Sequence, residues 1–327
     1  MKRIVVTDKI KLWAKAYAGK VLKDFKPEVA LESLKAQLTG DEKNYVEDVI
    51  SLLPEILELL PWKYNKFYLD YFAKYDKVDH YVKLDETKKL KDANGKNVSL
   101  QLYQHIVNAL QYSAVQQKMF PEYANKMGIR SCVYCNAQYA VSSKKGKTDR
   151  SASCRTTYTL DHWKPKSKYP YLAVAFFNLY PCCAPCNQAK SFYERDWMLY
   201  CKDGEETNPF EFDVDYLSMV DYLLTWDAEK LKIKFAPKED GDYSEYDEKF
   251  HISKLYGNFT SEVEEVIWRS RIYSPKMIEA MKDSGVYKLM PHEVNRFIIG
   301  NYDREEDILK RPLAKLIQDV ARQLGVI

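Results

Sequence analysis

Residues 176–191 read FFNLYPCCAPCNQAKS, and this stretch, together with an upstream CVYC, decides the fold that we expect. Each stretch contains a C-x-x-C pair, Cys132 with Cys135 and Cys183 with Cys186. This spacing lets two thiolates bind one ion, and two such pairs complete the tetrahedral four-thiolate shell of a structural zinc site. A redox-active or coincidental pair is the alternative reading, but the second pair argues against it. The sequence therefore predicts one structural Zn²⁺.

The remaining cysteines are Cys154, Cys182 and Cys201. Cys182 directly precedes Cys183, but only Cys183 has the C-x-x-C register with Cys186. The chain opens with MKRIVVTDKIKLW, whose apolar run is too short for a secretory signal peptide. C-x-x-C pairs in a chain without an export signal indicate metal ligands rather than disulfides. We therefore expect a cytoplasmic protein.

Positive charge gathers between the two cysteine pairs. Residues 142–168 carry a net charge of +6, whereas the rest of the chain sums to −3. The basic residues of this window are Lys144, Lys145, Lys147, Arg150, Arg155, Lys164, Lys166 and Lys168. Such clustering is expected where a polyanion docks. The loop SSKKGKTDR within it is equally compatible with a solvated hairpin tip.

Composition and length exclude several classes of protein. The chain has 327 residues, of which 46% are hydrophobic and 30% charged, as in globular proteins with a substantial core. The longest nearly apolar run, YLAVAFFNLYPCC, is shorter than the ~18 residues of a membrane-spanning helix, so no membrane is expected as a partner. No Gly-rich phosphate loop and no Ser-His-Asp order occurs, which leaves ATPase and serine-hydrolase functions without support.

Three regions are expected along the chain. Residues 1–128 follow a helical pattern, in which Pro54 predicts a kink or two abutting helices and Asn94-Gly95 a tight turn. Residues 129–204 contain the cysteines, the basic cluster and short β-prone runs. Residues 205–327 include a strand candidate, LKIKF, an acidic segment DGDYSEYDEK that reads as a solvated loop, and a C-terminal amphipathic helix.

The order of motifs resembles a known nuclease family. Between and after the cysteine pairs the chain reads DHWKPKSKYP (161–170), then NLYPCCAPCNQAK (178–190). This order of D-H, N-L and C-x-x-C-N-x-x-K resembles the ββα-metal core of zinc-bound HNH endonucleases, over about residues 129–200. The residues of these motifs are similar to those of the HNH nucleases of Septu-type bacterial anti-phage systems, which are paired with an ATPase. With the helical patterns of the flanking regions, the resemblance predicts an α+β fold, mostly helical, with a central ββα-metal HNH core held together by the four-cysteine zinc site.

The resemblance also implies roles for single residues. Asp161 and Asn187 are expected to bind a catalytic Mg²⁺ or Mn²⁺, with Asn187 opening the helix after the second cysteine pair. His162, with an ordinary pKa near ~6.5, is expected to take a proton from the attacking water. Asn178 is expected to hold the base-bearing loop through backbone hydrogen bonds. Lys190 is expected to contact phosphate or the metal-site carboxylate.

Lys166 and Lys168 are weaker candidates for nucleic-acid contacts. At two positions the chain departs from the usual HNH pattern. Many HNH proteins have a histidine where this chain has Asn187, and many have an acid where it has Thr159. A single carboxylate then serves the catalytic ion, which predicts a weak site.

The leading hypothesis is a metal-dependent endonuclease that hydrolyses DNA, as the effector of an anti-phage system and under the control of an ATPase partner. One alternative is a non-catalytic zinc module that binds nucleic acid or protein. Another is an HNH nuclease that cuts RNA or tRNA, since phosphate contacts carry no sugar signature.

Overall fold

The computed structural model describes residues 2–81, 100–144, 154–195, 197–238, 244–283 and 291–327. Within them the chain is α+β: helices predominate, and the strands form four two-stranded sheets. The predicted turn at Asn94-Gly95 and the basic residues Lys145, Lys147 and Arg150 lie outside these ranges.

The N-terminal region is helical, as predicted. Its helices are α1 (Asp8–Lys20), α2 (Pro27–Lys35), α3 (Gly40–Glu58), α4 (Tyr64–Phe67), α5 (Leu102–Ala109), α6 (Tyr112–Ala114) and α7 (Phe120–Lys126). Short π and 3-10 segments join them: η1 (Val21–Phe25), η2 (Pro61–Lys63), η3 (Tyr68–Phe72), η4 (Ala73–Tyr75) and η5 (Val115–Met119).

Local sequence explains where these helices begin and continue. Thr7 caps α1 by accepting a hydrogen bond from the backbone of Ile10, and Lys20 lies in its last turn, where a cation complements the helix dipole. The helix α3 runs unbroken past Pro54, so two abutting helices, one of the two alternatives predicted there, are wrong, and the kink stays a prediction. The buried face of α3, which includes Val49 and Leu53, packs into the core and outweighs the single missing N–H of the proline.

The middle of the chain forms a β-β-α unit. The strands β4 (Thr159–His162) and β5 (Leu179–Cys182) pair antiparallel, with Asp161 opposite Tyr180, and α8 (Ala184–Lys190) follows directly. Two 3-10 turns, η6 (Pro170–Leu172) and η7 (Phe176–Asn178), lie in the connection between the strands. A second hairpin pairs β2 (Ser142–Lys144) with β3 (Cys154–Thr156). The strand β6 (Tyr200–Cys201) pairs parallel with β1 (Ile4–Val5) near the N-terminus.

The C-terminal region combines one hairpin with helices. The strands β7 (Phe210–Val214) and β8 (Ile233–Pro237) pair antiparallel, and β8 confirms the strand predicted at LKIKF with a shift of two residues. The helical elements are α9 (Tyr216–Thr225), η8 (Ala228–Lys230), α10 (Ser244–Phe250), α11 (Ile252–Tyr256), α12 (Thr260–Ile272), α13 (Pro275–Asp283), α14 (Pro291–Ile299), η9 (Glu305–Lys310) and α15 (Ala314–Gln323). Side chains of Asp319 and Gln323 on α15 accept hydrogen bonds from the backbone of β7, which satisfies its free edge.

One prediction in this region is wrong. The acidic segment read as a solvated loop contains α10, and Tyr246 is buried within it. Tyr246 and Phe250 are four residues apart, so both rings fall on one helix face and pack inward. The acidic side chains of the segment lie on the outer face of the helix, and their abundance is the reason that composition alone suggested a loop.

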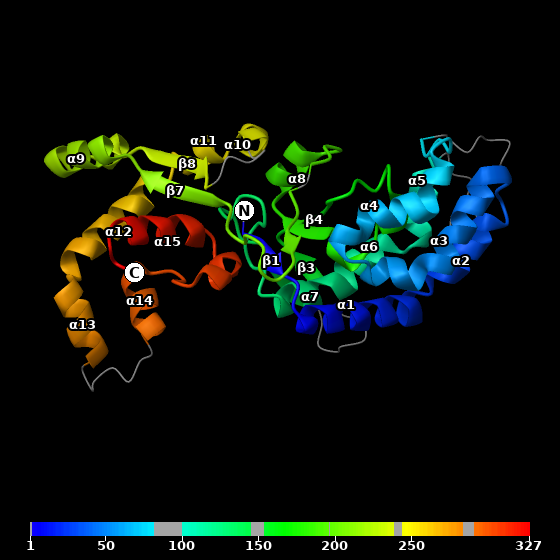
Figure 1. The fold of residues 1–327 in the computed structure, drawn as a ribbon, viewed down its shortest axis with the longest axis horizontal. Helices are drawn as coiled ribbons and strands as arrows, with labels where there is room; N and C mark the ends of the chain where they lie inside the picture. Colours follow the sequence, from blue (N-terminus) through cyan, green and yellow to red (C-terminus); the bar gives the residue numbers. More distant parts are fainter. Residues whose placement is uncertain (1, 82–99, 145–153, 196, 239–243, 284–290) are drawn as a thin grey trace.

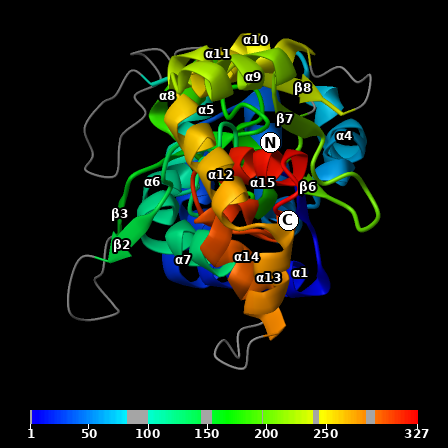
Figure 2. The same ribbon diagram turned by 90° about the vertical axis from the view of Figure 1, so that its left-hand side faces the viewer.

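Figure 1 shows α2–α5 at one end of the molecule, α12–α15 at the other, and β4 with α8 between them, and Figure 2 views the molecule from the end of α12–α15. A continuous set of buried apolar side chains extends from Val6 to Val326 and includes all four paired cysteines. The three regions predicted from sequence therefore share one core, and their boundaries remain predictions. No helix in the described ranges is both long and apolar enough to cross a membrane.

Candidate metal centre and active site

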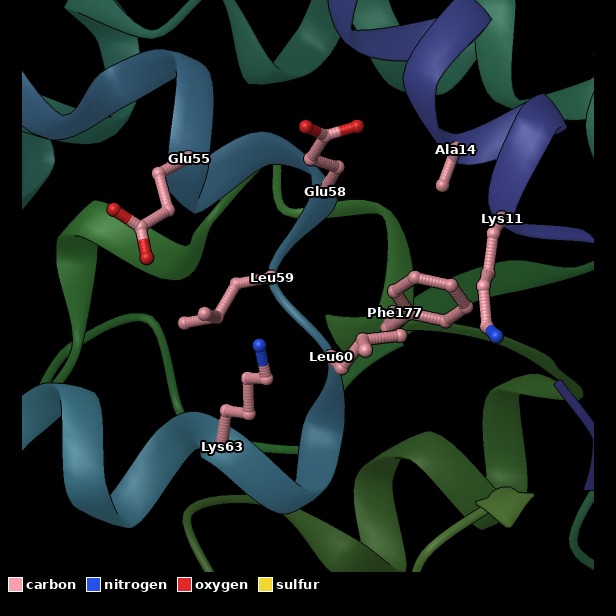
Figure 3. A pocket seen from close by; sticks show the side chains of 8 residues that line it. All are labelled: Lys11, Ala14, Glu55, Glu58, Leu59, Leu60, Lys63 and Phe177. Atoms are coloured by element: carbon pink, nitrogen blue, oxygen red, sulfur yellow. The ribbon is translucent and has the colours of Figure 1, made fainter. Parts of the chain in front are cut away.

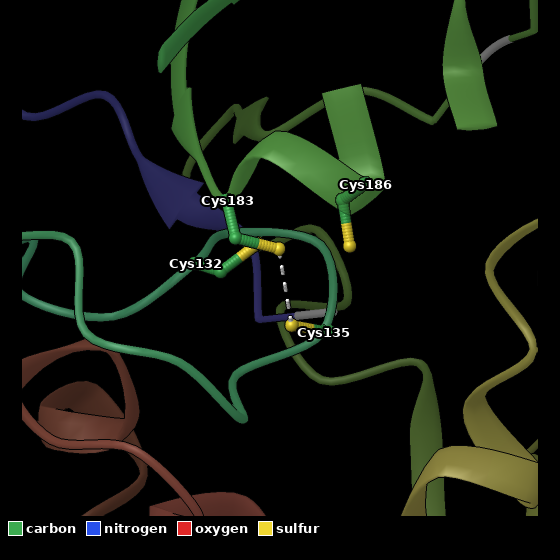
Figure 4. A group of neighbouring side chains, drawn as sticks. All are labelled: Cys132, Cys135, Cys183 and Cys186. Carbon is green, nitrogen blue, oxygen red and sulfur yellow. Dashed lines mark hydrogen bonds between the residues drawn. The ribbon is translucent and has the colours of Figure 1, made fainter. Parts of the chain in front are cut away.

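The four paired cysteines lie together. Their sulfur atoms are all within 4.8 Å of one another, and the Sγ atoms of Cys135 and Cys183 are 3.9 Å apart (Figure 4). A tetrahedral zinc ion with Zn–S bonds near 2.3 Å requires sulfur–sulfur distances of about 3.8 Å. The 3.9 Å between the sulfur atoms of Cys135 and Cys183 is nearly twice the length of the S–S bond in a disulfide. The four side chains are buried and can hold a structural metal ion such as zinc.

Local backbone geometry produces this arrangement. Cys183 precedes the first residue of α8 and Cys186 lies in its first turn, so the helix brings both sulfurs to one side. The loop of the first pair is anchored by the backbone of β5, because the N–H of Val133 donates to Pro181 O at 3.2 Å. Cys182, the last residue of β5, points elsewhere: its sulfur lies 3.8 Å from the hydroxyl of Thr159.

Asp161 contacts α8 and also the loop of the first cysteine pair, residues 132–136, which is called the zinc loop below for the ion that its cysteines could hold. Its Oδ2 accepts a hydrogen bond from the hydroxyl of Tyr134 at 2.5 Å, and the ammonium of Lys190 is 3.1 Å from the same oxygen. Both Asp161 and Lys190 are buried. Burial raises the pKa of the Asp161 carboxyl, and the positive charge of Lys190 opposes that rise.

His162 faces the other side of β4, as alternation along a strand requires. Its Nε2 lies 3.0 Å from the carbonyl oxygen of Ala173, and a carbonyl can only accept, so Nε2 carries the proton. Nδ1 is then unprotonated, and it has no hydrogen-bond partner among the described residues. Burial, with the nearby charge of Lys166, lowers the pKa of His162 to about 3, which keeps the imidazole neutral at physiological pH but makes it a weaker proton acceptor than the free imidazole expected from the sequence. The ring of Tyr112 packs beside it at 4.8 Å between centroids.

Asn178 is fully buried and bonds only to backbone. Its Oδ1 accepts from the N–H of Lys164 at 2.8 Å, and its Nδ2 donates to Lys164 O at 3.1 Å and to Leu172 O at 3.0 Å. These three bonds tie the segment that follows His162 to the turn η6. Asn178 therefore holds the shape of the loop and does not enter the site itself.

The sequence predicted Asn187 at the first position of α8, but the structure places it at the fourth residue of this helix. The reason is that Cys183, not the residue before Asn187, serves as the N-terminal cap. Asn187 lies three residues before Lys190, which contacts Asp161, so the two side chains project from neighbouring positions of α8. Its side chain is half-buried and has no hydrogen-bond partner in the ranges the structure describes.

The lysines differ in what they can reach. Lys190 is buried on Asp161 and donates to the carbonyl of His162 at 2.6 Å, so it meets the carboxylate and not the surface. Lys168 is exposed and pairs with Glu194 at 3.1 Å. Lys166 is half-buried, with its ammonium 4.7 Å above the ring of Tyr112. Burial lowers the pKa of Lys166.

Sequence reasoning missed two residues of the site, Tyr134 and Tyr112. Tyr134 had a signal, since it lies between the two cysteines of the first pair. Tyr112 had none, because it reaches His162 from a helical segment fifty residues upstream.

A cavity of about 260 Å³ lies elsewhere, between α1 and the end of α3 (Figure 3). It is lined by Lys11, Ala14, Glu55, Glu58, Leu59, Leu60, Lys63 and Phe177. None of these residues belongs to the site described above.

Comparisons of the chain with family models, with curated proteins and with solved structures find no match.

Proposed function

We propose that the protein is a metal-dependent endonuclease of the HNH type that hydrolyses phosphodiester bonds of DNA. The observation that carries this proposal is the state of His162. Its Nε2–H is held by Ala173, its Nδ1 is free of partners among the described residues, and its neighbour in β4 is a buried carboxylate. The β4–β5–α8 order and the four-cysteine cluster support the same assignment.

The chain's own residues supply base and positive charge. Nδ1 of His162 accepts the proton of a water molecule as the water oxygen attacks phosphorus, and the P–O bond to the 3′ oxygen breaks. The products carry a 5′-phosphate and a 3′-hydroxyl, as in the family that the sequence resembles, and the leaving oxygen takes its proton from solvent. Lys166, beside His162, places positive charge near the phosphate.

The donor atoms of the site fit a divalent ion. A carboxylate offers about four lone-pair positions, and Tyr134 and Lys190 use only part of this capacity at Asp161. The amide oxygen of Asn187 supplies a second oxygen ligand of the kind that Mg²⁺ accepts. Asp161 and Asn187 would hold Mg²⁺ or Mn²⁺, which when bound stabilises negative charge on the leaving oxygen.

The decisive experiment measures nicking of a supercoiled plasmid with Mg²⁺ or Mn²⁺. His162→Ala should abolish nicking while zinc content stays unchanged. The matched control is His251→Asn, because His251 is exposed and has a positive φ of 50° that asparagine tolerates. Equal nicking by His162→Ala and the wild type would overturn the proposal.

One observation favours a second candidate function. The ammonium of Lys190 already neutralises Asp161, as in a purely structural ion pair. A non-catalytic zinc module would bind nucleic acid in a salt-sensitive manner with no turnover under any divalent ion. Running the same assay on RNA, including tRNA, separates the DNA nuclease from an RNA-cutting one.

The proposed biological role is anti-phage defence, with a regulatory ATPase as partner, because the motif residues are similar to those of Septu nucleases. An intracellular nuclease of low sequence specificity needs such control. Co-expression with an ATPase encoded beside this protein, where the genome contains one, should yield a stable complex. Full activity of the protein alone would count against the partner.

A further inference from the structure

The loop of the first cysteine pair contacts the candidate active site through one side chain. Tyr134 lies between Cys132 and Cys135, and its hydroxyl donates to Asp161 Oδ2 at 2.5 Å. A phenol bonded to a buried carboxylate is a short, charge-assisted hydrogen bond and therefore a strong one. The side chain of a residue in the zinc loop thus orients the acid that the proposed function assigns to the catalytic ion.

The ring of Tyr134 is held by aromatic neighbours. It stacks on Phe250 of α10, with centroids 4.7 Å apart and planes 19° apart, and lies 6.2 Å from Tyr180 of β5. Tyr134 is almost fully buried, at 2% exposure. A ring packed on two sides has little rotamer freedom, so its hydroxyl stays where Asp161 accepts from it.

The backbone of the same loop is held by the C-terminal region. Tyr246 of α10 donates to Tyr134 O at 2.5 Å, and Tyr256 of α11 donates to Cys135 O at 2.6 Å. Both tyrosines are buried, at 1% exposure each. Next in the loop, Asn136 donates to Ile308 O at 2.9 Å. The zinc loop is therefore fixed on one side by the metal cluster and on the other by α10, α11 and η9.

A purely structural role would not require this choice of acceptor. Buried tyrosine hydroxyls usually find a hydrogen-bond partner, and Tyr17 uses the backbone carbonyl of Val174 for that purpose. Tyr134 instead binds an oxygen of Asp161, so moving its loop moves the hydrogen bond on the carboxylate.

We infer that Tyr134 is a positioning residue for Asp161, and that the C-terminal region sets its position through Tyr246 and Tyr256. This inference rests on the proposed function, because it assigns Asp161 a metal ion to hold. It gives the C-terminal region a way to regulate the site without touching the substrate: a shift of α10 and α11 changes the placement of Asp161 through the zinc loop.

The test compares Tyr134→Phe with Tyr222→Phe in the zinc-loaded full chain. Tyr222 is a matched control because it is fully buried and its hydroxyl accepts from Trp268 Nε1 at 2.7 Å, in helices outside the site. Mn²⁺ binding is measured by electron paramagnetic resonance, and kcat and KM by plasmid nicking. Removing an outer partner of a metal ligand weakens metal binding about 10- to 100-fold, so Tyr134→Phe should raise the Kd for Mn²⁺ by that factor. Its zinc content and its KM for DNA should stay unchanged, and raising the Mn²⁺ concentration should restore kcat.

The double variant Tyr246→Phe/Tyr256→Phe should also raise the Kd for Mn²⁺, with zinc retained. This variant provides the test if Tyr134→Phe does not fold. A Kd equal to that of the wild type in these variants, with an active wild type, overturns the inference and leaves the proposed function standing. A wild type that neither binds Mn²⁺ nor cuts DNA overturns both.

Discussion

The ammonium of Lys190 lies 3.1 Å from Oδ2 of Asp161, so a cation of the chain itself neutralises the buried acid of the candidate site. Replacing Lys190 by methionine would keep the apolar stem and leave the carboxylate without its charge partner. We expect the free energy of unfolding to fall by about 3–5 kcal/mol without divalent ions. Excess Mn²⁺ should recover part of that loss, because an ion that binds only the folded state stabilises it.

Denaturant unfolding with and without Mn²⁺ measures this effect. Lys168→Met is the matched control, since its pair with Glu194 is exposed and should be worth less than about 1 kcal/mol. Equal losses for the two variants would contradict a central role for the buried pair.

The two asparagines of the motif should respond differently to substitution. Asn178→Ala removes three hydrogen bonds to backbone in a fully buried place and should lower the free energy of unfolding by about 3 kcal/mol. Asn187→Ala removes an amide with no partner in the described structure, so stability should change little while Mn²⁺ binding and nicking fall. Thermal unfolding and Mn²⁺ titration of both variants distinguish the roles, and an Asn187→Ala protein that binds Mn²⁺ normally would exclude Asn187 as a ligand.

Adjacent cysteines allow a sharp test of the zinc ligands. Cys183→Ser should release the metal and lower the melting temperature strongly, because metal binding contributes directly to folding. Cys182→Ser should retain about one zinc ion per chain, since the sulfur of Cys182 lies against Thr159 and outside the cluster. Metal analysis of the purified variants gives the answer. Zinc loss from Cys182→Ser alone would mean that the ligand set is misassigned.

Stability should depend on pH through Glu305. Burial alone would raise the pKa of this carboxyl, but hydrogen bonds from Lys2 and Thr207, each 2.7 Å long, lower it to about 2. A lowered pKa means that the unfolded chain binds protons more readily, so this stabilisation is present above about pH 4.5 and is lost as the pH falls toward 2. Because the side chain is 40% exposed, we expect only about 1 kcal/mol. Urea unfolding of Glu305→Gln should show that deficit at pH 7 and a smaller one at pH 3.

Short-range sequence patterns predicted the parts of the molecule that depend on neighbours along the chain. The C-x-x-C spacings identified the four thiolates, because a loop or a first helical turn brings residues three apart to one ion. Apolar periodicity identified the long helices and the strand at β8. The acidic segment around Tyr246 was misread, because its composition suggested solvent while two aromatic residues on one helix face carry it into the core.

By itself the sequence determined which residue types were available: four thiolates, one Asp-His pair and two asparagines in a fixed order. Only the tertiary structure decided their partners, placing Lys190 on Asp161, Ala173 O on His162, and Tyr246 and Tyr256 on the zinc loop. These contacts join segments up to 121 residues apart. Such pairings are selected by the packing of the whole core, and no local spacing encodes them.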